Sequence, residues 1–252
     1  MAALRLIAGA EPIDPTLDAA ISRALMLRVA AGELPDTLRI SRPAASVAFG
    51  KRDQINPGYQ EAAAAARAAG FEATERLAGG RAAVFHEGTI HLSHSLRDGD
   101  PRSGVTRRFD ATADLIVDAL RDLGVDAHVG EVEGEYCPGA HSVNARHAVK
   151  IVGVGQRVVH GGAHLGGVVV VDGEQRVRDV LEPVYAALAL AWRPETTGSV
   201  TREVGSASWD DVRSAIERTY ADRYELEAGE LDGKTLALAE RLQPEHLSPA
   251  GV

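Results

Sequence analysis

The sequence has very little cysteine and lysine. Cys137 is the one cysteine among 252 residues, and Lys51, Lys150 and Lys234 are the three lysines among 27 basic residues. A lone cysteine excludes a disulfide within the chain and every zinc or iron–sulfur site that needs a cysteine pair. Arginine cannot deprotonate, so a lysine kept inside a strand-like run, as Lys150 is, can be there for its amine. The alternative is a surface lysine without a role.

Long apolar runs are also absent. No stretch approaches the ~20 apolar residues that a membrane-spanning helix needs. The first residues, MAALRLIAGAEP, are too short and too weakly apolar for a signal peptide. A net charge of −9 argues against nucleic acid as a general partner. We therefore expect a cytoplasmic protein with neither a membrane nor nucleic acid as a partner.

Several familiar site motifs are missing. No H-E-x-x-H pattern occurs, and His91 and His94 fall on opposite faces of a predicted strand, so we predict no metal site. No Walker A pattern occurs either. The pair Gly153 and Gly155 lacks the third glycine and the following helix of a dinucleotide-binding fingerprint.

The remaining composition is that of an ordinary globular protein, with 45% hydrophobic and 25% charged residues. The sequence has no internal repeat and no long linker. We predict a single domain over residues 1–242 and a frayed tail over residues 243–252, which is polar and contains two prolines.

Hydrophobic periodicity predicts an alternation of strands and helices. Asp14 and Pro15 are typical of a helix start, and apolar residues recur every fourth position up to Val29. The expected strands cover residues 4–8, 37–41, 45–50, 72–76 and 125–129, and residues 147–171 suggest a strand, a turn and two further strands. The expected helices cover residues 14–31, 59–69, 107–123, 177–191, 209–224 and 230–242.

The stretch from Tyr136 to Val171 holds the two rarest residue types together. Pro138 and Gly139 follow Cys137 and place the thiol on a turn. Lys150 stands thirteen residues after the cysteine, with His141 and His147 between them as further groups that could acidify the thiol. A buried structural cysteine is the alternative, although that role favours an apolar run, which Glu-Gly-Glu-Tyr-Cys-Pro-Gly is not.

A second glycine-rich stretch runs from Arg76 to His86. Gly79 and Gly80 suggest a tight connection between two strands, and a glycine pair also lets a ligand approach the backbone closely. The alternative is an ordinary hairpin flanked by the solvated arginines Arg76 and Arg81.

Together these stretches resemble the lipoate/biotin protein ligase and octanoyltransferase family. The run Arg76-Leu-Ala-Gly-Gly-Arg-Ala-Ala-Val-Phe-His86 is similar to the family signature R-x-x-G-G-G/R-A-V-x-H, and Lys150-Ile-Val-Gly-Val-Gly-Gln-Arg157 is similar to K-I-x-G-x-x-Q-R. Leu38-Arg39 and residues 48–54 match weaker family patterns, and the resemblance covers residues 15 to 190. It implies an α+β fold with a mixed β-sheet packed by helices, as in the family's catalytic domain.

Within that family the cysteine favours a subgroup. Tyr136-Cys137-Pro138-Gly139 looks like the amidotransferases that move an octanoyl or lipoyl group between lipoyl-carrying proteins. Gly80-Arg81 looks more like the octanoyltransferases that draw on an acyl carrier protein. The expected partners are therefore lipoyl-domain proteins or acyl carrier protein, and the donor stays open.

The resemblance implies a reaction and a site. Cys137 would carry the acyl group as a thioester, and Lys150 would orient the acyl carbonyl and stabilise the anion. No cofactor would be required. Two alternatives stay open: an ATP-dependent lipoate ligase in which the cysteine is incidental, and a non-catalytic member that binds a lipoyl-type ligand. The residues implied in substrate binding are Arg76, Gly79, Gly80, His86, Gly139, Gly153 and Gln156.

Overall fold

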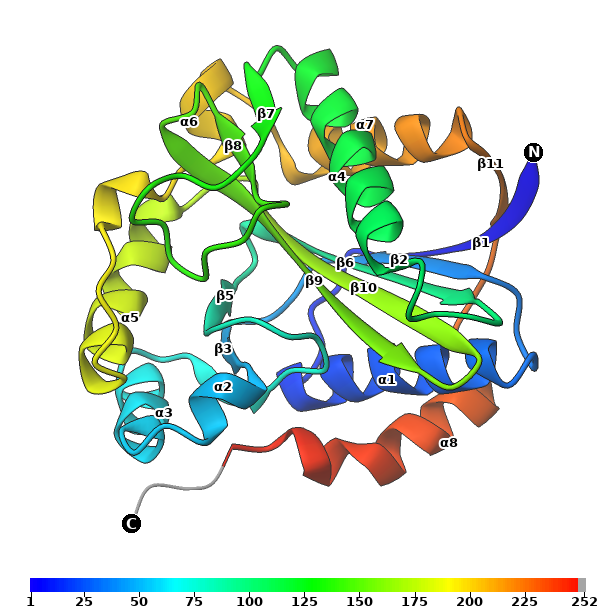
Figure 1. Ribbon diagram of the computed structural model, residues 1–252, viewed down its shortest axis with the longest axis horizontal. Coiled ribbons are helices and arrows are strands. Elements are labelled where there is room, and N and C mark those ends of the chain that lie inside the picture. The colour runs from blue at the N-terminus through cyan, green and yellow to red at the C-terminus, as the bar shows by residue number, and fades with distance from the viewer. Residues whose placement is uncertain (249–252) are drawn as a thin grey trace.

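A computed structural model describes residues 1–248, and these residues form two β-sheets surrounded by helices (Figure 1). In the larger sheet β1 pairs parallel with β2 and β11, whereas the other neighbours pair antiparallel. The sheet is therefore mixed, and the predicted α+β class is confirmed. Its strands, in spatial order, are β11 (Tyr224–Ala228), β1 (Ala2–Gly9), β2 (Thr37–Ser41), β6 (Thr89–Arg97), β10 (Gly162–Val170), β9 (Val149–Val159), β8 (Val143–Ala145) and β7 (Ala127–Val129). The smaller sheet has the order β4 (Glu72–Glu75), β3 (Ser46–Phe49), β5 (Ala83–Phe85).

Helices cover both faces of the larger sheet (Figure 1). The helices α4 (Val105–Asp122) and α7 (Trp209–Ala221) pack on one face, and α1 (Pro15–Ala30) and α8 (Gly233–Leu242) pack on the other. A third pair, α3 (Tyr59–Ala68) and α5 (Glu174–Ala187), packs against the smaller sheet. The short helices are α2 (Lys51–Gln54), α6 (Val200–Val204) and the 3₁₀ turns η1 (Pro194–Thr196) and η2 (Gln243–His246). No helix within residues 1–248 is long and apolar enough to cross a bilayer.

The two faces of β2 show why the sheet accepts a helix layer on each side. Leu38 and Ile40 are fully buried in the core formed with α4 and α7. Side chains alternate along a strand, so Arg39 and Ser41 project to the opposite face, where α1 lies. One face is therefore apolar, whereas the face toward α1 carries polar groups, and this face contributes to a cavity.

The predicted helix start at residue 14 is confirmed. The Asp14 carboxylate accepts the N–H groups of Thr16 and Leu17, each at 3.0 Å, and Pro15 occupies the first helical position. This cap satisfies two of the backbone donors that a helix start leaves unpaired. Pro183 lies inside α5, which continues to Ala187, so the predicted helix around that proline is also confirmed.

Two expectations about strand connections are wrong. The extra strand expected within residues 147–171 does not form, because β9 continues unbroken from Val149 to Val159, through Gly153 and Gly155, as it pairs with β10. Gly79 and Gly80 do not join a hairpin either. The strands on either side of them, β4 and β5, both pair with β3 and not with each other, so the glycines lie in a loop that passes over the sheet.

Non-local contacts order segments that lack a local signal. Strand β11, in which no strand was expected, forms by pairing with β1. The tail expected to fray is ordered over residues 243–248: His246 is buried with Nδ1 2.7 Å from the Glu75 carbonyl oxygen, and Ser248 lies 2.6 Å from the Tyr59 hydroxyl. The rest of the expected tail, residues 249–252, lies outside the described residues. That residues 1–242 form a single domain stays a prediction.

A buried ion pair joins α1 to the polar face of the larger sheet. The Asp18 carboxylate accepts a hydrogen bond from the Arg39 guanidinium and lies 2.5 Å from Nδ1 of His91. Burial opposes ionisation of Asp18, but the charges of Arg39 and His91 outweigh it and hold the pKa of this carboxyl far below its usual value.

We expect Asp18→Asn to lower the free energy of unfolding by about 3–5 kcal/mol, because it leaves the buried Arg39 guanidinium without its counter-charge. Chemical denaturation at neutral pH measures the loss. The matched control is Asp118→Asn, which breaks an exposed pair with Arg223 and should cost less than about 1 kcal/mol. Equal losses of unfolding free energy in the two variants would show that the buried pair stabilises the fold no more than the exposed one.

Candidate active site

A cavity of about 320 Å³ opens between α1, the loops 76–82 and 130–142, and the strands β6, β9 and β10. It brings together residues from both sequence stretches singled out above. The predicted site residues in its wall are Arg76, Gly79, Gly80, Cys137, Gly139, Lys150, Gly153 and Gln156.

His86 is the predicted site residue that the structure places elsewhere. It directly follows Phe85, which lines the cavity, and because neighbouring side chains on an extended chain point to opposite sides, His86 turns away. Its Nδ1 accepts the N–H of Gly88 at 3.0 Å. Burial lowers the pKa of His86 to about 4, so the ring is neutral. His86 is therefore absent from the wall of this cavity, and its expected part in an acyl slot stays a prediction.

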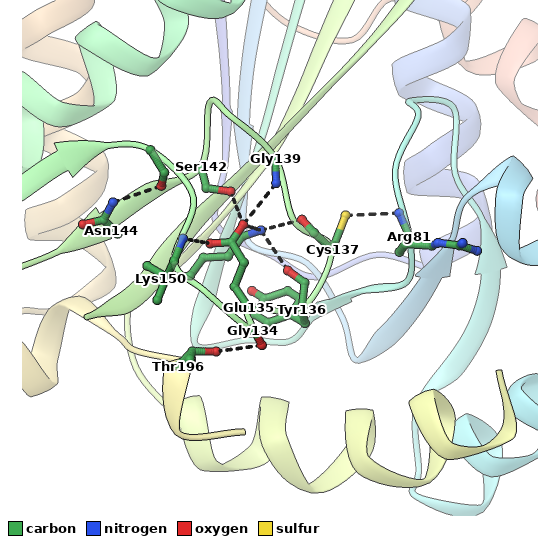
Figure 2. Close-up of polar contacts among 12 residues, drawn as sticks. Arg81, Gly134, Glu135, Tyr136, Cys137, Gly139, Ser142, Asn144, Lys150 and Thr196 are labelled. Atoms are coloured by element: carbon green, nitrogen blue, oxygen red, sulfur yellow. Dashed lines mark hydrogen bonds and ion pairs between the residues drawn. The ribbon is translucent and has the colours of Figure 1, made fainter. Parts of the chain in front are cut away.

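The thiol of Cys137 lies against the glycine-rich loop. Its Sγ accepts the backbone N–H of Arg81 at 3.1 Å, and Nη2 of Arg76 is 3.5 Å away (Figure 2 shows the Arg81 contact). Burial opposes ionisation of the thiol. The positive charges of Arg76 and Lys150 and the hydrogen bonds outweigh it, and the pKa of Cys137 falls below the usual value. These charges and hydrogen bonds therefore favour the thiolate form of Cys137.

The backbone of Cys137 is held in an uncommon conformation. Its φ of 44° lies in the left-handed region, which residues other than glycine seldom adopt. Two contacts hold it there: the Cys137 N–H donates to the Tyr185 hydroxyl at 2.8 Å, and the Cys137 carbonyl accepts from Nζ of Lys150 at 2.7 Å. Such backbone conformations cost about 1–3 kcal/mol each and cluster at functional sites, where the surrounding structure imposes them.

Lys150 is a fully buried ammonium beneath the cysteine loop. Its Nζ donates to the carbonyl oxygens of Tyr136 and Cys137 and to Oε1 of Glu135 at 3.0, 2.7 and 3.0 Å (Figure 2). Three donors thus meet three acceptors. The ammonium acts on the thiol through its field and through the loop backbone. Its predicted contact with an acyl carbonyl stays a prediction.

Glu135 is a site residue that the sequence interpretation missed. The stretch Gly130 to Gly134 before it reads as an acidic, irregular connection, which is typical of solvated carboxylates. In the structure the Glu135 side chain is completely buried and accepts four hydrogen bonds. Its position two residues before the cysteine was the only sequence signal.

The two histidines near the cysteine contact other side chains, and neither contributes to the lowered pKa of Cys137. His141 stacks on Phe109 at 4.8 Å and lies 3.0 Å from Asp110. His147 stacks on His128, with ring centroids 4.0 Å apart. Arg76, expected only to line the slot, takes their place beside the thiol.

Gln156 and the glycines of β9 shape the cavity wall. Oε1 of Gln156 accepts from Nε of Arg108, and Nε2 donates to the carbonyl oxygen of Val105, so its amide anchors the start of α4. A Cβ added to Gly155 would lie 3.0 Å from Cβ of Ala78. Because glycine has no Cβ, the loop 76–82 can pack closely on the strand at this point.

Comparison with known proteins places the chain by family. The model of the lipoyl protein ligase A/B catalytic domain matches residues 14–218, most of the chain. The chain belongs to this family. The sequence resemblance is thereby confirmed.

Two relatives from bacteria carry a more specific name. The chain is 29% identical over 167 residues to an octanoyl-GcvH:protein N-octanoyltransferase of Anoxybacillus flavithermus, and 28% identical over 156 residues to one of Bacillus velezensis. These matches cover 64% and 60% of this chain but 59% and 53% of the relatives, so the chain spans little more than half of their length.

Solved structures share the fold. A lipoate-protein ligase A bound with ATP superposes with a TM-score of 0.78 at 21% identity, covering 97% of this chain and 95% of that one. A bipartite lipoate protein ligase of Thermoplasma acidophilum gives a TM-score of 0.73 at 20% identity, with coverage of 97% and 93%. At this identity the likeness concerns the fold alone.

Within residues 1–248 of this family member, no group of three or more His, Cys, Asp or Glu side chains could hold a metal ion. That the protein needs no metal stays a prediction.

Gly80 and Gly79 give a matched test of the site geometry. A Cβ on Gly80, whose φ is +104°, would lie 2.2 Å from Nη2 of Arg76 and 2.9 Å from Sγ of Cys137, whereas a Cβ on Gly79 meets nothing within 4 Å. We expect Gly80→Ala to slow alkylation of Cys137 by iodoacetamide about tenfold at neutral pH, because the guanidinium is displaced from the thiol. Gly79→Ala should stay within about twofold of wild type. Similar rates in the two variants would contradict this geometry.

Proposed function

We propose that this protein is an acyltransferase that moves an octanoyl or lipoyl group through a thioester on Cys137 to a lysine of a lipoyl-domain protein. The observation that carries the proposal is the Cys137 thiol, which lines the cavity with a lowered pKa and lies against the Arg81 N–H. Family membership and the names of the two bacterial relatives support it. We expect the protein to act in the cytoplasm.

The proposed reaction has two balanced steps. The Cys137 thiolate attacks the acyl carbonyl of the donor; a C–S bond forms, the bond from that carbonyl to the donor's lysine nitrogen or carrier sulfur breaks, and the leaving group takes up a proton. The neutral amine of the acceptor lysine then attacks the thioester, the C–S bond breaks, and the amine loses a proton as the amide forms and the thiolate is released. Covalent catalysis of this kind divides one difficult transfer into two easier ones.

The donor that fits this scheme best is an octanoylated or lipoylated protein, by analogy with the bacterial relatives. When both the bond broken and the bond formed are lysine amides, the overall exchange needs no energy from ATP. Acyl carrier protein is the second possible donor, and its thioester would enter the same first step. No cofactor takes part in either case.

The cavity suits a medium-length acyl chain. Its apolar wall includes Ala78, Phe85, Val154 and Val168, and each buried methylene contributes about 0.8 kcal/mol to binding. The charged carboxylate in the wall, Asp18, is already bonded within the protein, so it does not need a polar ligand.

Intact-mass spectrometry tests the nucleophile. Wild-type protein mixed with an octanoylated lipoyl-domain protein, without ATP, should gain one octanoyl mass that hydroxylamine removes. Cys137→Ser should gain no thioester and should transfer at least about a hundredfold more slowly, because an unactivated hydroxyl is a much weaker nucleophile than a thiolate.

The same Ser variant separates the alternatives. Normal turnover of Cys137→Ser with ATP and free octanoate would identify an ATP-dependent ligase and overturn the proposal. Binding of octanoate without any adduct or transfer in the wild type would identify a non-catalytic binding protein.

A further inference from the structure

Glu135 occupies the centre of the cysteine loop although it does not touch the thiol. Its Oε1 accepts from Nζ of Lys150 at 3.0 Å, from Oγ of Ser142 at 2.5 Å and from the N–H of Gly139 at 3.2 Å, and its Oε2 accepts the N–H of Val132 at 3.0 Å (Figure 2). The side chain is 0% exposed. A carboxylate this deeply buried is tolerated only where it is paired and hydrogen-bonded, and these four donors meet that requirement.

The four donors come from the two ends of the loop and from the strand beneath it. Val132 lies before Cys137, Gly139 and Ser142 lie after it, and Lys150 lies on β9. The Glu135 carboxylate therefore links the segments before and after the cysteine to each other and, through Lys150, to the larger sheet. The remaining two hydrogens of the ammonium bond the carbonyl oxygens of Tyr136 and Cys137.

This arrangement affects the reactivity of the thiol because the backbone of Cys137 has a left-handed φ, which a residue other than glycine seldom adopts unless its surroundings impose it. With the Cys137 carbonyl held by Lys150, the left-handed φ of 44° keeps Sγ at the Arg81 N–H. If the ammonium lost its charged partner, the buried Lys150 would have to move toward other acceptors or toward water. The carbonyl it holds would be released with it.

We infer that Glu135 is the positioning residue of this active site: its carboxylate holds Lys150 and the loop 130–142 in the arrangement that keeps the Cys137 thiol against Arg81 and Arg76. This inference rests on the proposed role of Cys137 as nucleophile and assigns to Glu135 no contact with substrate.

The charged and titratable groups around the thiol come from several elements. Arg76 precedes the glycine-rich loop, Lys150 belongs to β9, and the Tyr185 hydroxyl of α5 accepts the Cys137 N–H. Glu135 and Tyr136 belong to the cysteine loop itself, and Asp53 of α2 faces the site through Arg81. Among these groups, the charges of Arg76 and Lys150 favour the thiolate. Displacement of Lys150 therefore acts directly on ionisation of the thiol.

The test uses the pH dependence of Cys137 alkylation by iodoacetamide, which needs no acyl substrate. Glu135→Gln keeps the size of the side chain but removes its charge. We expect the alkylation profile of this variant to move to higher pH and the rate near about pH 7 to fall about tenfold, because less thiol is ionised. Acylation by the octanoyl donor should slow by a similar factor.

Two further variants serve as controls. Glu203→Gln removes another largely buried carboxylate, 8% exposed and paired with Arg146 outside the cavity wall, and it should leave the alkylation profile unchanged. Glu135→Asp keeps the charge on a shorter side chain and should restore part of the rate. If Glu135→Gln does not fold, comparison of Glu135→Asp with wild type carries the test, with a smaller shift in the same direction.

A double-mutant cycle identifies the route of the effect. In a Lys150→Met background, Glu135→Gln should change the alkylation rate less than about twofold, because the interaction that it breaks is already absent. An unchanged profile in Glu135→Gln, or an undiminished effect in the Lys150→Met background, would overturn the inference.

The readouts also separate this inference from the proposed function. Acylation of wild-type Cys137 together with an unchanged alkylation profile in Glu135→Gln would refute the positioning role alone. A shifted profile in a protein that no octanoyl donor acylates would refute the proposed transfer but leave the positioning role standing.

Discussion

The buried interaction between Lys150 and the loop 130–142 is the constraint on which the site depends. An ammonium without access to water requires acceptors for all of its hydrogens, and here the loop supplies every one: the Glu135 carboxylate and the carbonyl oxygens of Tyr136 and Cys137. The hydrogen bonds of the Lys150 ammonium therefore stabilise one conformation of the loop, and in that conformation Sγ of Cys137 lies at the Arg81 N–H. One electrostatic requirement thus links the sheet, the loop and the Cys137 thiol.

The glycine-rich loop completes the environment of the thiol from the other side of the cavity. Gly80 has no Cβ, so Arg76 and Sγ of Cys137 can both approach its backbone, and the N–H of Arg81 points at the sulfur. The two stretches recognised in the sequence thus have different tasks. One holds the cysteine in place and contributes the charge of Lys150, and the other supplies the Arg81 N–H and the charge of Arg76, which also favour the thiolate.

The fold brings these stretches together through the layered arrangement of its two sheets. The smaller sheet carries the glycine-rich loop between β4 and β5, while β9 of the larger sheet carries Lys150. The polar side of the larger sheet, where Asp18 of α1 meets Arg39 and His91, closes the cavity without leaving an unpaired carboxylate. The other face of the same sheet is apolar and packs against α4 and α7, so one face of the sheet contributes to the core and the opposite face borders the cavity.

The sequence by itself determined the local structure and the family: the Asp14 cap, the helix periodicity, the two signatures, and the candidate pair Cys137 and Lys150 all depend on residues near one another in the chain. Only the tertiary structure decided which strands pair, since the contacts that form β11 and bury residues 243–248 lie far apart in sequence. It also decided the roles around the thiol. His86 faces away, Arg76 replaces the histidines beside the sulfur, and Glu135, one acidic residue among many in the sequence, becomes the buried partner of Lys150 because the fold removes both from water.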